Sequence, residues 1–564
     1  MTSTFHARTR RTAAVLVGAS LLAAGTVGTA LAGPAEPGPA QPGGQANTRA
    51  TDGVLYRESF DSLADDLLPR AEDPGIEDGV VGFTHTAPRG WSVENGPDMA
   101  DGGVEEWRGW SFTTRDFWTD AEDQMRYRFA RAQDVIAVAD SDEFADGAGT
   151  PGGYATTLAS APVKVKGRDR VELTFDSHYR GWAGQTGRVT VAFDGGAETE
   201  LVRYDSSTVT DNYDGALMNA TETVPVDVPR GAKRAVFRWH FTAGANSWYW
   251  AIDSVAVRAP LPSASGDPTT AWVLSDIQGD PDDLGHALRD LDAVRPDADG
   301  LLMVGDIVDS GSAAQWREVD DVMTGAAGVL PEQVVAAIGN HESYTGESWE
   351  TLRDRFLDFA ERDRVWDEYL LEGSGGDVPV LVLGQEAARP PEVPMSREQV
   401  EWLRERLAYW SERDKQVLVI SHFPLGDTVS ASWIPWYSDS YQYNDELTEL
   451  LGAHPNAILF SGHTHYPFEL GDWAVQRRTA GGHPDGFWTV NTGAVQVEWD
   501  ARGEATSGIK EIVTRDVNRG LTVDVFDDRV VVEARDFGTV DARTPDNEVN
   551  DVVRSVTIPN PLTR

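Results

Sequence analysis

Five short apolar runs lie between residues 271 and 465, and each stops abruptly at a polar residue. They belong to the segments AWVLSDIQGD, GLLMVGDIVDSG, VVAAIGNHE, VLVISHFP and AILFSGHTH. A few aliphatic or β-branched residues followed by Asp, Asn or His are typical of a buried strand that delivers a functional side chain at its carboxyl end. Open α/β sheets bind their ligands at those ends. The pattern therefore predicts an α/β domain whose site is assembled from five strand ends.

A different pattern, with alternating apolar and polar residues between Gly, Asp and Asn turns, occupies residues 51–260. This alternation predicts an antiparallel β-sandwich. Its final run, SWYWAIDSVAV, resembles the last strands of jelly-roll, carbohydrate-binding-like modules, which implies a jelly-roll-like fold and contact with glycans. Exposed indoles could stack on sugar rings, but the same residues could equally fill the core. The tryptophans concerned are Trp91, Trp107, Trp110, Trp118, Trp182, Trp239, Trp248 and Trp250.

The remaining segments set the domain boundaries. Residues 1–32 combine Arg8, Arg10 and Arg11 with an apolar stretch that ends in Ala-Leu-Ala, which predicts a signal peptide of the Sec or twin-arginine type. Residues 33–50 are rich in Pro, Gly and Ala and predict a flexible leader. Residues 261–269 are expected to be a linker, and residues 270–558 the α/β domain. A secreted protein without a membrane span in its mature form is therefore expected, and an uncleaved anchor is the alternative.

Composition narrows the chemistry of the predicted site. The 564-residue chain has no cysteine, which excludes disulfides and thiolate metal sites. Its net charge of −43 is spread along the sequence, so a nucleic-acid partner is unexpected. The acidic segment DSDEFADG, residues 140–147, could hold a structural Ca²⁺ in the N-terminal domain, although its spacing matches no fixed ligand pattern.

The polar residues that follow the five runs are carboxylates, amides and imidazoles, which together suit a pair of divalent metal ions. Two such ions can hold a phosphoryl group between them and activate water at neutral pH. Spacings of two residues let neighbouring side chains converge on one point. The candidate metal ligands are Asp276, Gln278, Asp306, Asn340, His422, His463 and His465.

Five motifs within roughly residues 270–500 resemble those of the calcineurin-like metallophosphoesterase superfamily. In chain order they are D-x-Q, G-D-x-x-D, G-N-H-E, a lone His after a strand, and G-H-x-H. The resemblance implies a four-layer α/β-β/α sandwich in which Asp306 bridges two ions. It assigns Asp276, Gln278 and His465 to one ion, and Asn340, His422 and His463 to the other. It also implies that His341 protonates the leaving oxygen and that Asp309 orients His341 through a carboxylate–imidazole hydrogen bond.

Two positions depart from the superfamily's pattern. Gln278 stands where the first motif usually has His, and an amide oxygen favours Mn²⁺ or Mg²⁺ over zinc; iron and zinc remain alternatives. Ser310 stands where the protein Ser/Thr phosphatases of the superfamily have an Arg that grips phosphate. A phosphoprotein substrate is therefore disfavoured, and small-molecule or polymeric phosphate esters stay open.

Three elements are expected around these motifs. Residues 396–410 predict a helix with Val400, Leu403, Leu407 and Trp410 on one face. Residues 520–538 and 552–561 read as strands that complete the second sheet of the sandwich. Residues 424–445 form a long segment without periodicity that is expected to wall the substrate cleft or to pack on its surroundings. Its aromatic residues are Trp433, Trp436, Tyr437, Tyr441 and Tyr443.

The sequence thus predicts a secreted two-metal phosphohydrolase that cleaves phosphate mono- or diesters, with His341 as general acid. The alternative is a cell-surface or polysaccharide-binding protein whose phosphoesterase core is degenerate. The complete ligand set and the Asp309–His341 pair favour the enzyme.

Overall fold

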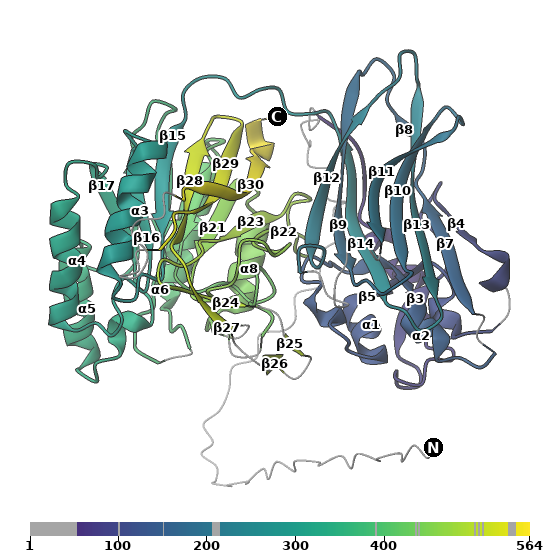
Figure 1. Ribbon diagram of the computed structural model, residues 1–564, viewed down its shortest axis with the longest axis horizontal. Helices are drawn as coiled ribbons and strands as arrows, with labels where there is room; N and C mark the ends of the chain where they lie inside the picture. The colour runs from purple at the N-terminus through teal and green to yellow at the C-terminus, as the bar shows by residue number, and fades with distance from the viewer. Residues whose placement is uncertain are drawn as a thin grey trace, which may run out of the picture. The chain divides into compact units, whose positions relative to one another are not determined.

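A computed structural model describes residues 53–99, 102–149, 152–205, 215–389, 392–434, 437, 440–500, 504–505, 508–509, 513–539 and 549–563. The predicted signal peptide and leader lie outside these residues. Figure 1 shows an N-terminal β-region, residues 53–259, followed by an α/β region, residues 269–563. Within the described part of the chain, no helix is both long and apolar enough to cross a bilayer.

Two antiparallel sheets form the N-terminal β-region. The first contains, in spatial order, β12 (Ala220–Asp227), β9 (Arg170–Tyr179), β14 (Tyr249–Arg258), β6 (Val135–Asp140), β5 (Ser111–Thr114), β3 (Val81–Thr84) and β2 (Leu68–Pro69), with β1 (Val54–Glu58) paired to β14. The second contains β11 (Glu198–Asp205), β10 (Thr186–Phe193), β13 (Arg234–Gly244), β7 (Gly153–Ala159) and β4 (Ser92–Asn95), with β8 (Val163–Lys164) paired to β13. Short helical segments connect them: η1 (Asp61–Asp66), η2 (Pro97–Met99), η3 (Glu105–Trp107), α1 (Arg115–Ala121), η4 (Arg126–Arg128) and α2 (Ser141–Ala145).

One hydrophobic core joins the two sheets of the β-region, and most of the tryptophans belong to it. Alternation along β9 and β13 points every second side chain inward, as the sequence pattern predicts. Trp182, by contrast, is 42% exposed and meets the half-buried Trp248 edge to face. Glycan stacking therefore stays a prediction that concerns Trp182 alone. The buried indoles are those of Trp91, Trp107, Trp110, Trp118, Trp239 and Trp250.

Two six-stranded mixed sheets build the α/β region. The first has the order β17 (Gln333–Ala337), β16 (Gly300–Val304), β15 (Thr269–Leu274), β28 (Arg519–Val525), β29 (Arg529–Asp536) and β30 (Asp551–Pro559). The second has the order β18 (Asp367–Leu371), β19 (Val378–Val382), β20 (Val417–Ile420), β21 (Ala457–Ser461), β23 (Phe487–Asn491) and β22 (Ala474–Arg477). Small ribbons add β24 (Val497–Asp500) with β27 (Val513–Asp516), and β25 (Glu504–Ala505) with β26 (Gly508–Ile509).

Three hydrophobic clusters stack these sheets and their helices into four layers. One cluster lies between the two sheets. A second packs helices onto the outer face of the first sheet, and a third packs helices onto the second sheet. The helices of the first set are α3 (Pro281–Val294), α4 (Ala313–Gly325) and α5 (Trp349–Phe359), preceded by η5 (His341–Ser343); those of the second are α6 (Arg397–Ser411) and α8 (Asn444–Gly452). The chain closes with η6 (Pro561–Thr563).

The helix expected over residues 396–410 is confirmed as α6, whose N-cap Ser396 accepts a hydrogen bond from the Gln399 amide. Val400, Leu403 and Leu407 are fully buried, as one apolar helix face requires. The expectation for the last strands is wrong in one respect. β28 pairs antiparallel with β15, so β28 to β30 extend the first sheet rather than the second.

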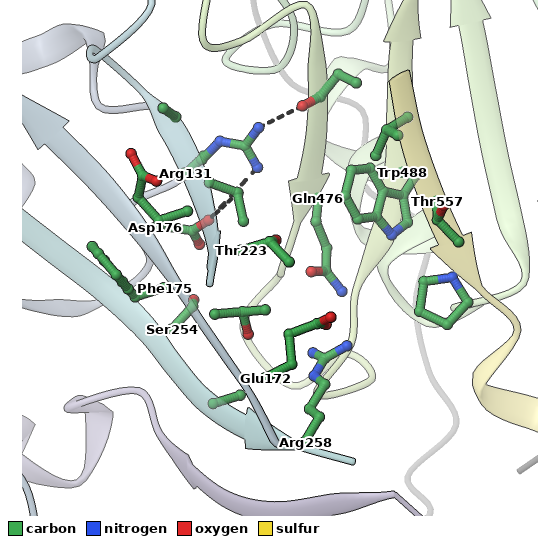
Figure 2. A pocket seen from close by; sticks show the side chains of 18 of the residues that line it. Arg131, Glu172, Phe175, Asp176, Thr223, Ser254, Arg258, Gln476, Trp488 and Thr557 are labelled. Carbon is green, nitrogen blue, oxygen red and sulfur yellow. Dashed lines mark hydrogen bonds and ion pairs between the residues drawn. The ribbon is translucent and has the colours of Figure 1, made fainter. Parts of the chain in front are cut away.

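Buried polar contacts join the β-region to the α/β region, and a cavity of about 900 Å³ lies between them. Figure 2 shows Arg131 reaching from the β-region towards Asp176 and, across the boundary, to a backbone carbonyl. Arg258, Glu172 and Gln476 face the cavity from both sides. The two regions therefore meet through side chains that are already paired at several points.

Candidate metal centre

All seven predicted ligands lie just after strand ends, as the sequence pattern indicates. In the first sheet, Asp276 and Gln278 follow β15, Asp306 follows β16, and Asn340 follows β17. In the second sheet, His422 follows β20, and His463 and His465 follow β21. β15, β16 and β17 run parallel to one another, and so do β20 and β21. The carboxyl ends of these strands, from both sheets, therefore meet at one site.

Two groups of donor atoms share Asp306. Asp276, Asp306 and His465 form the first donor group, and Asp306, His422 and His463 form the second; within each group the donor atoms lie within 4.8 Å of one another. His465 Nε2 lies 3.0 Å from Asp276 Oδ1, and His422 Nε2 lies 3.0 Å from Asp306 Oδ2. This is the spacing expected around two cations that share one carboxylate.

The two amide ligands complete these groups. The Gln278 amide nitrogen lies 3.2 Å from Asp306 Oδ2 and 3.2 Å from His465 Nε2. Asn340 Oδ1 lies 3.1 Å from His422 Nε2. Each amide thus lies beside the donor group to which the resemblance assigns it, and the ligand role of each stays a prediction.

Backbone carbonyls fix which imidazole nitrogen faces the centre. His422 Nδ1 donates to the Val304 carbonyl at 2.9 Å, and His465 Nδ1 donates to the Val497 carbonyl at 2.7 Å. Each Nε2 therefore faces the carboxylates, an arrangement that suits metal binding once this nitrogen has lost its proton. Oxygen and imidazole donors without thiolates fit Mn²⁺, Fe, Zn²⁺ or Mg²⁺.

Most of the ligand backbone is left-handed. The φ angles are 52° at Asp276, 46° at Gln278, 50° at Asp306, 70° at His463 and 56° at His465. Non-glycine residues rarely adopt this conformation, and it is retained where the surroundings over-determine it, often at functional sites. The turns after the strands therefore adopt a backbone conformation of higher energy, which directs these side chains inward.

Two glycines permit this close approach. A Cβ at Gly339 would lie 2.2 Å from the Asp306 carboxylate, and a Cβ at Gly462 would lie 2.2 Å from that of Asp276. Neither contact is possible for a real side chain. The glycine that precedes Asn340 and the one that precedes His463 are thus required by sterics.

Burial and mutual attraction shift the protonation of the central groups. Burial opposes a charge on His422, but the Asp306 carboxylate more than offsets it and raises the pKa of His422 to about 9. Burial would raise the pKa of Asp306, yet His422 lowers it below its ordinary value. Burial lowers the pKa of His463 to about 3. The centre holds its carboxylates ionised, the form that binds cations.

His341 lies at the edge of the centre, with Nε2 3.9 Å from Asp306 Oδ2 and its side chain 23% exposed. Its Nδ1 donates to the backbone carbonyl of Asp309 at 2.6 Å, whereas the Asp309 carboxylate lies 3.7 Å away. The expected carboxylate–imidazole hydrogen bond is therefore replaced by a carbonyl–imidazole bond. The physical reason is that the Asp309 carboxylate is 56% exposed and turns towards solvent.

Glu342 is a residue of this site that the sequence pattern alone did not single out. Its fully buried carboxylate accepts from the backbone amides of Gly339, at 2.6 Å, and of Ile307, at 2.7 Å. It also accepts from the Asp306 amide at 3.2 Å. It thereby ties the turn after β16 to the turn after β17. Its place directly after His341 in the G-N-H-E motif is the signal that could have identified it.

Aromatic side chains surround the centre in a cavity of about 570 Å³. Among the described residues that line it there is no lysine or arginine. Trp499 of β24 stacks on His465 with ring centroids 5.0 Å apart, a contribution that no motif foretold. Of the segment 424–445, Tyr437 reaches the cavity, while Trp436 lies outside the described residues. The lining consists of Gln278, Asp306, Asn340, His341, Tyr344, Phe423, Tyr437, His463, His465 and Trp499.

The acidic segment suggested for Ca²⁺ lies in the β-region. Carboxylates of Glu122, Asp142 and Glu143 come within 4.8 Å of one another. The buried guanidinium of Arg126 lies 2.8 Å from Glu143 and 2.9 Å from Asp140, so its positive charge balances part of the negative charge of this cluster. Calcium binding there stays a prediction.

Comparison with known proteins agrees with this geometry. The family of calcineurin-like phosphoesterases matches residues 269–467. A probable cyclic nucleotide phosphodiesterase of Rhodococcus erythropolis is 28% identical over 173 residues, which are 30% of this chain and 52% of that protein. The 3',5'-cyclic adenosine monophosphate phosphodiesterase CpdA of Escherichia coli K12 is 26% identical over 196 residues, 34% of this chain and 63% of that protein.

A purple acid phosphatase from yellow lupin (Lupinus luteus) seeds has 15% identity and a TM-score of 0.37, covering 73% of this chain and 81% of its own. The chain spans between about half and two thirds of the length of the two phosphodiesterases it matches.

Proposed function

Because this chain belongs to the calcineurin-like phosphoesterases through residues 269–467, we propose that it is a two-metal phosphohydrolase. The observation that carries the proposal is the pair of buried donor groups that share Asp306. Five ionisable donors converge there, and the described cavity lining contributes no lysine or arginine to balance them. A site of this charge needs cations from solution.

The ligands divide between two ions as follows. Asp276, Gln278 and His465 would hold one ion, and Asn340, His422 and His463 would hold the other, with Asp306 shared. When bound, two divalent ions supply positive charge to the phosphoryl oxygens and lower the pKa of water. The carbonyls of Val304 and Val497 keep the His422 and His465 rings in the required tautomer.

His341 is the proposed proton donor. Its Nδ1 donates to the Asp309 carbonyl, which fixes the ring and leaves Nε2 as the nitrogen directed at the cavity. The amide of His341 donates to Asp306 Oδ1 at 2.8 Å, so its backbone is held at a fixed distance from the shared carboxylate. Nε2 can then deliver a proton to the departing alkoxide oxygen.

Phosphodiesters are the substrate class that we propose. A diester carries a single negative charge, and a cavity whose described lining has no lysine or arginine has less to offer the second charge of a monoester. Relatives named as cyclic nucleotide phosphodiesterases support the same choice. The aromatic side chains of Tyr344, Tyr437 and Trp499 suit a flat organic group on the ester.

The test is turnover of bis(p-nitrophenyl) phosphate and of p-nitrophenyl phosphate by chelator-treated protein, before and after addition of Mn²⁺. We expect activity only with metal, and a higher kcat/KM for the diester. Asp227→Asn, at an exposed carboxylate of the β-region that pairs with Arg170, is a control that should respond to Mn²⁺ as wild type does. Hydrolysis that ignores metal would refute the two-metal proposal, and preference for the monoester would refute the diester assignment.

We also propose that the protein is exported, on the basis of the signal-peptide pattern in residues 1–32. Amino-terminal sequencing of protein recovered from the culture medium should give a chain beginning near residue 33. Protein found only inside cells with residues 1–32 retained would contradict export.

A further inference from the structure

We infer that the N-terminal β-region is a working part of the active site, because it holds residues 424–434 and Tyr437, here called the wall segment, against the metal cavity. Arg128 of the β-region is the positioning residue in this arrangement. The inference rests on the proposed function and adds to it a means by which the accessory region sets substrate preference. It follows from contacts on both sides of the wall segment.

The wall segment lacks regular structure through residue 434 and yet is almost entirely buried. It connects β20 to α8, so it begins directly beside His422. Trp433 is 5% exposed, Ile434 is 3% exposed, and Ala431 is fully buried although its φ angle is 69°. Local turns are closed by hydrogen bonds within the segment, such as that from the Ser432 amide to the Val429 carbonyl at 3.0 Å. These bonds link near neighbours only, so the position of the segment against the cavity depends on what packs against it.

Arg128 provides the principal contact from the β-region. Its guanidinium carbon lies 4.6 Å from the centre of the Trp433 ring, and Arg128 is itself only 3% exposed. Tyr127 packs against the hydrophobic cluster to which Trp433 belongs. A cation over an indole face is worth most when both groups are removed from water, as they are here.

A second attachment runs through Asp472, which follows the metal-ligand turn of β21. The Ser430 amide donates to the Asp472 carbonyl at 3.1 Å, and the Ser430 hydroxyl donates to the Asp472 carboxylate. From the β-region, the Asn219 amide donates to the same carboxylate at 3.3 Å. The Asp472 side chain therefore binds the β-region and the wall segment at once.

A third attachment lies nearer the surface. Arg115 Nη2 lies 2.8 Å from Asp427 Oδ2, with side-chain exposures of 23% and 35%. A half-exposed pair of this kind adds little energy but restricts the direction of the chain. Three points of the wall segment, at Asp427, Ser430 and Trp433, are thus tied directly or through Asp472 to the β-region.

The wall segment reaches the metal cavity through Tyr437. Tyr437 shares a hydrophobic cluster with Trp433 and Ile434, and its ring centroid lies 5.1 Å from that of His463. Tyr437 also lines the cavity together with Trp499. A path of direct packing therefore runs from Arg128 through Trp433 to Tyr437, and from there to a metal ligand and to the space that substrate occupies.

Weakening these contacts should lower the affinity for the organic part of the substrate and leave metal binding intact. None of the predicted metal ligands belongs to the wall segment, and the rings of His422 and His465 are held by the carbonyls of Val304 and Val497. A merely structural role for Arg128 would instead alter stability and affect all substrates alike. The two roles are separated by substrates that share a leaving group and differ in bulk.

The experiment compares bis(p-nitrophenyl) phosphate with methyl p-nitrophenyl phosphate in wild type, Arg128→Met and Arg128→Lys, all loaded with Mn²⁺. Arg128→Met should raise KM for the bis-aryl ester by roughly threefold to tenfold, the scale of one desolvated cation–π contact. KM for the methyl ester and metal content should stay within about twofold. Arg128→Lys, which retains the cation, should recover most of the bis-aryl KM.

Arg170→Met is the matched control, since Arg170 of β9 pairs with Asp227 inside the β-region and is 56% exposed. It should leave both KM values unchanged. Hydrogen exchange of residues 424–434 gives an independent readout and should quicken in Arg128→Met but not in Arg170→Met. If Arg128→Met fails to fold, Trp433→Phe weakens the same contact from the other side and should give the same selective rise in KM.

Equal changes in KM for the two esters in Arg128→Met, or no change for either, would overturn the inference. Metal-dependent turnover by wild type would still support the proposed function in that case. Unchanged exchange in residues 424–434 would overturn it as well. Wild-type protein that hydrolyses neither ester would overturn the proposed function, and this inference with it.

Discussion

The metal cavity and the cavity between the two regions are both lined by charged side chains, but they balance that charge differently. In the metal cavity, carboxylates and imidazoles converge without a lysine or arginine among the described lining residues. In the other cavity, arginines stand beside carboxylates of the same chain. Figure 2 shows this for Arg131 and Asp176, which lie 3.6 Å apart. In the metal cavity the partners of the carboxylates are imidazoles, whose protons a cation can displace, whereas a guanidinium keeps its proton.

The pair formed by Arg478 and Asp253 illustrates the self-balanced case. Arg478 Nη2 lies 2.9 Å from Asp253 Oδ2, and its Nη1 lies 3.0 Å from Asp61 Oδ2. Asp253 and Asp61 belong to the β-region, whereas Arg478 follows β22 of the α/β region. These charges satisfy one another and join two parts of the fold, so they call for no ligand.

The largest expected effect comes from removing the shared carboxylate. Asp306→Asn takes a ligand from both ions, so bound metal should fall and turnover should drop on the order of 10³-fold or more. Elemental analysis and hydrolysis of bis(p-nitrophenyl) phosphate measure the two quantities. Two full equivalents of metal with undiminished turnover would remove Asp306 from the centre.

His341→Ala separates proton transfer from metal binding. Both ions should remain, while the rate falls by about 10²–10⁴-fold, the usual contribution of one positioned acid. The loss should be smaller for nitrophenyl esters than for alkyl esters, because a nitrophenolate leaves without a proton. Equal losses for the two ester types would argue against His341 as the acid.

Arg478→Met should affect stability rather than chemistry. It leaves Asp253 buried without its guanidinium, at a cost of about 3–5 kcal/mol in the free energy of unfolding. Urea denaturation measures the loss, and metal content and kcat should be unchanged. Arg353→Met, whose partner Asp354 is exposed, is the matched control. The double variant Arg478→Met/Asp253→Asn should recover part of the loss, and additive losses would contradict direct pairing.

Gln278→His should give the smallest effect, because it exchanges one proposed ligand and keeps the others. Imidazole in place of the amide should tighten binding at that ion by on the order of tenfold and shift preference towards zinc or iron. Metal titration by calorimetry with Mn²⁺ and Zn²⁺ tests this. An unchanged affinity for both ions would place Gln278 outside the coordination sphere.

The sequence predicted the elements better than their arrangement. Apolar runs that end at Asp276, Asp306 and His422 are local signals, and each proved to be a strand end. Strand pairing is not local, so nothing in residues 519–525 showed that β28 would pair with β15. Which tryptophans fill a core and which, like Trp182, stay exposed depends equally on distant strands.

At the site, residue types and spacing located the candidate ligands, because metal chemistry restricts the choice of side chain. Their backbone conformations were not foreseeable, since a φ of 70° at His463 goes against the preference of any residue with a Cβ. The contact of His341 with the carbonyl rather than the carboxylate of Asp309 depends on where a side chain turns in solvent. The stacking of Trp499 on His465 required β24 to be placed first.

The division of the ligands between two sheets has a consequence for the order of folding. Gln278 and His465 touch across the centre although they are 187 positions apart in the chain. Neither ion can be held by one sheet alone, so a nascent chain gains its full affinity for metal only after the two sheets have packed. Metal uptake is then a late event that reports completed assembly. Ions bound as proposed would in turn hold the two sheets together and slow their separation.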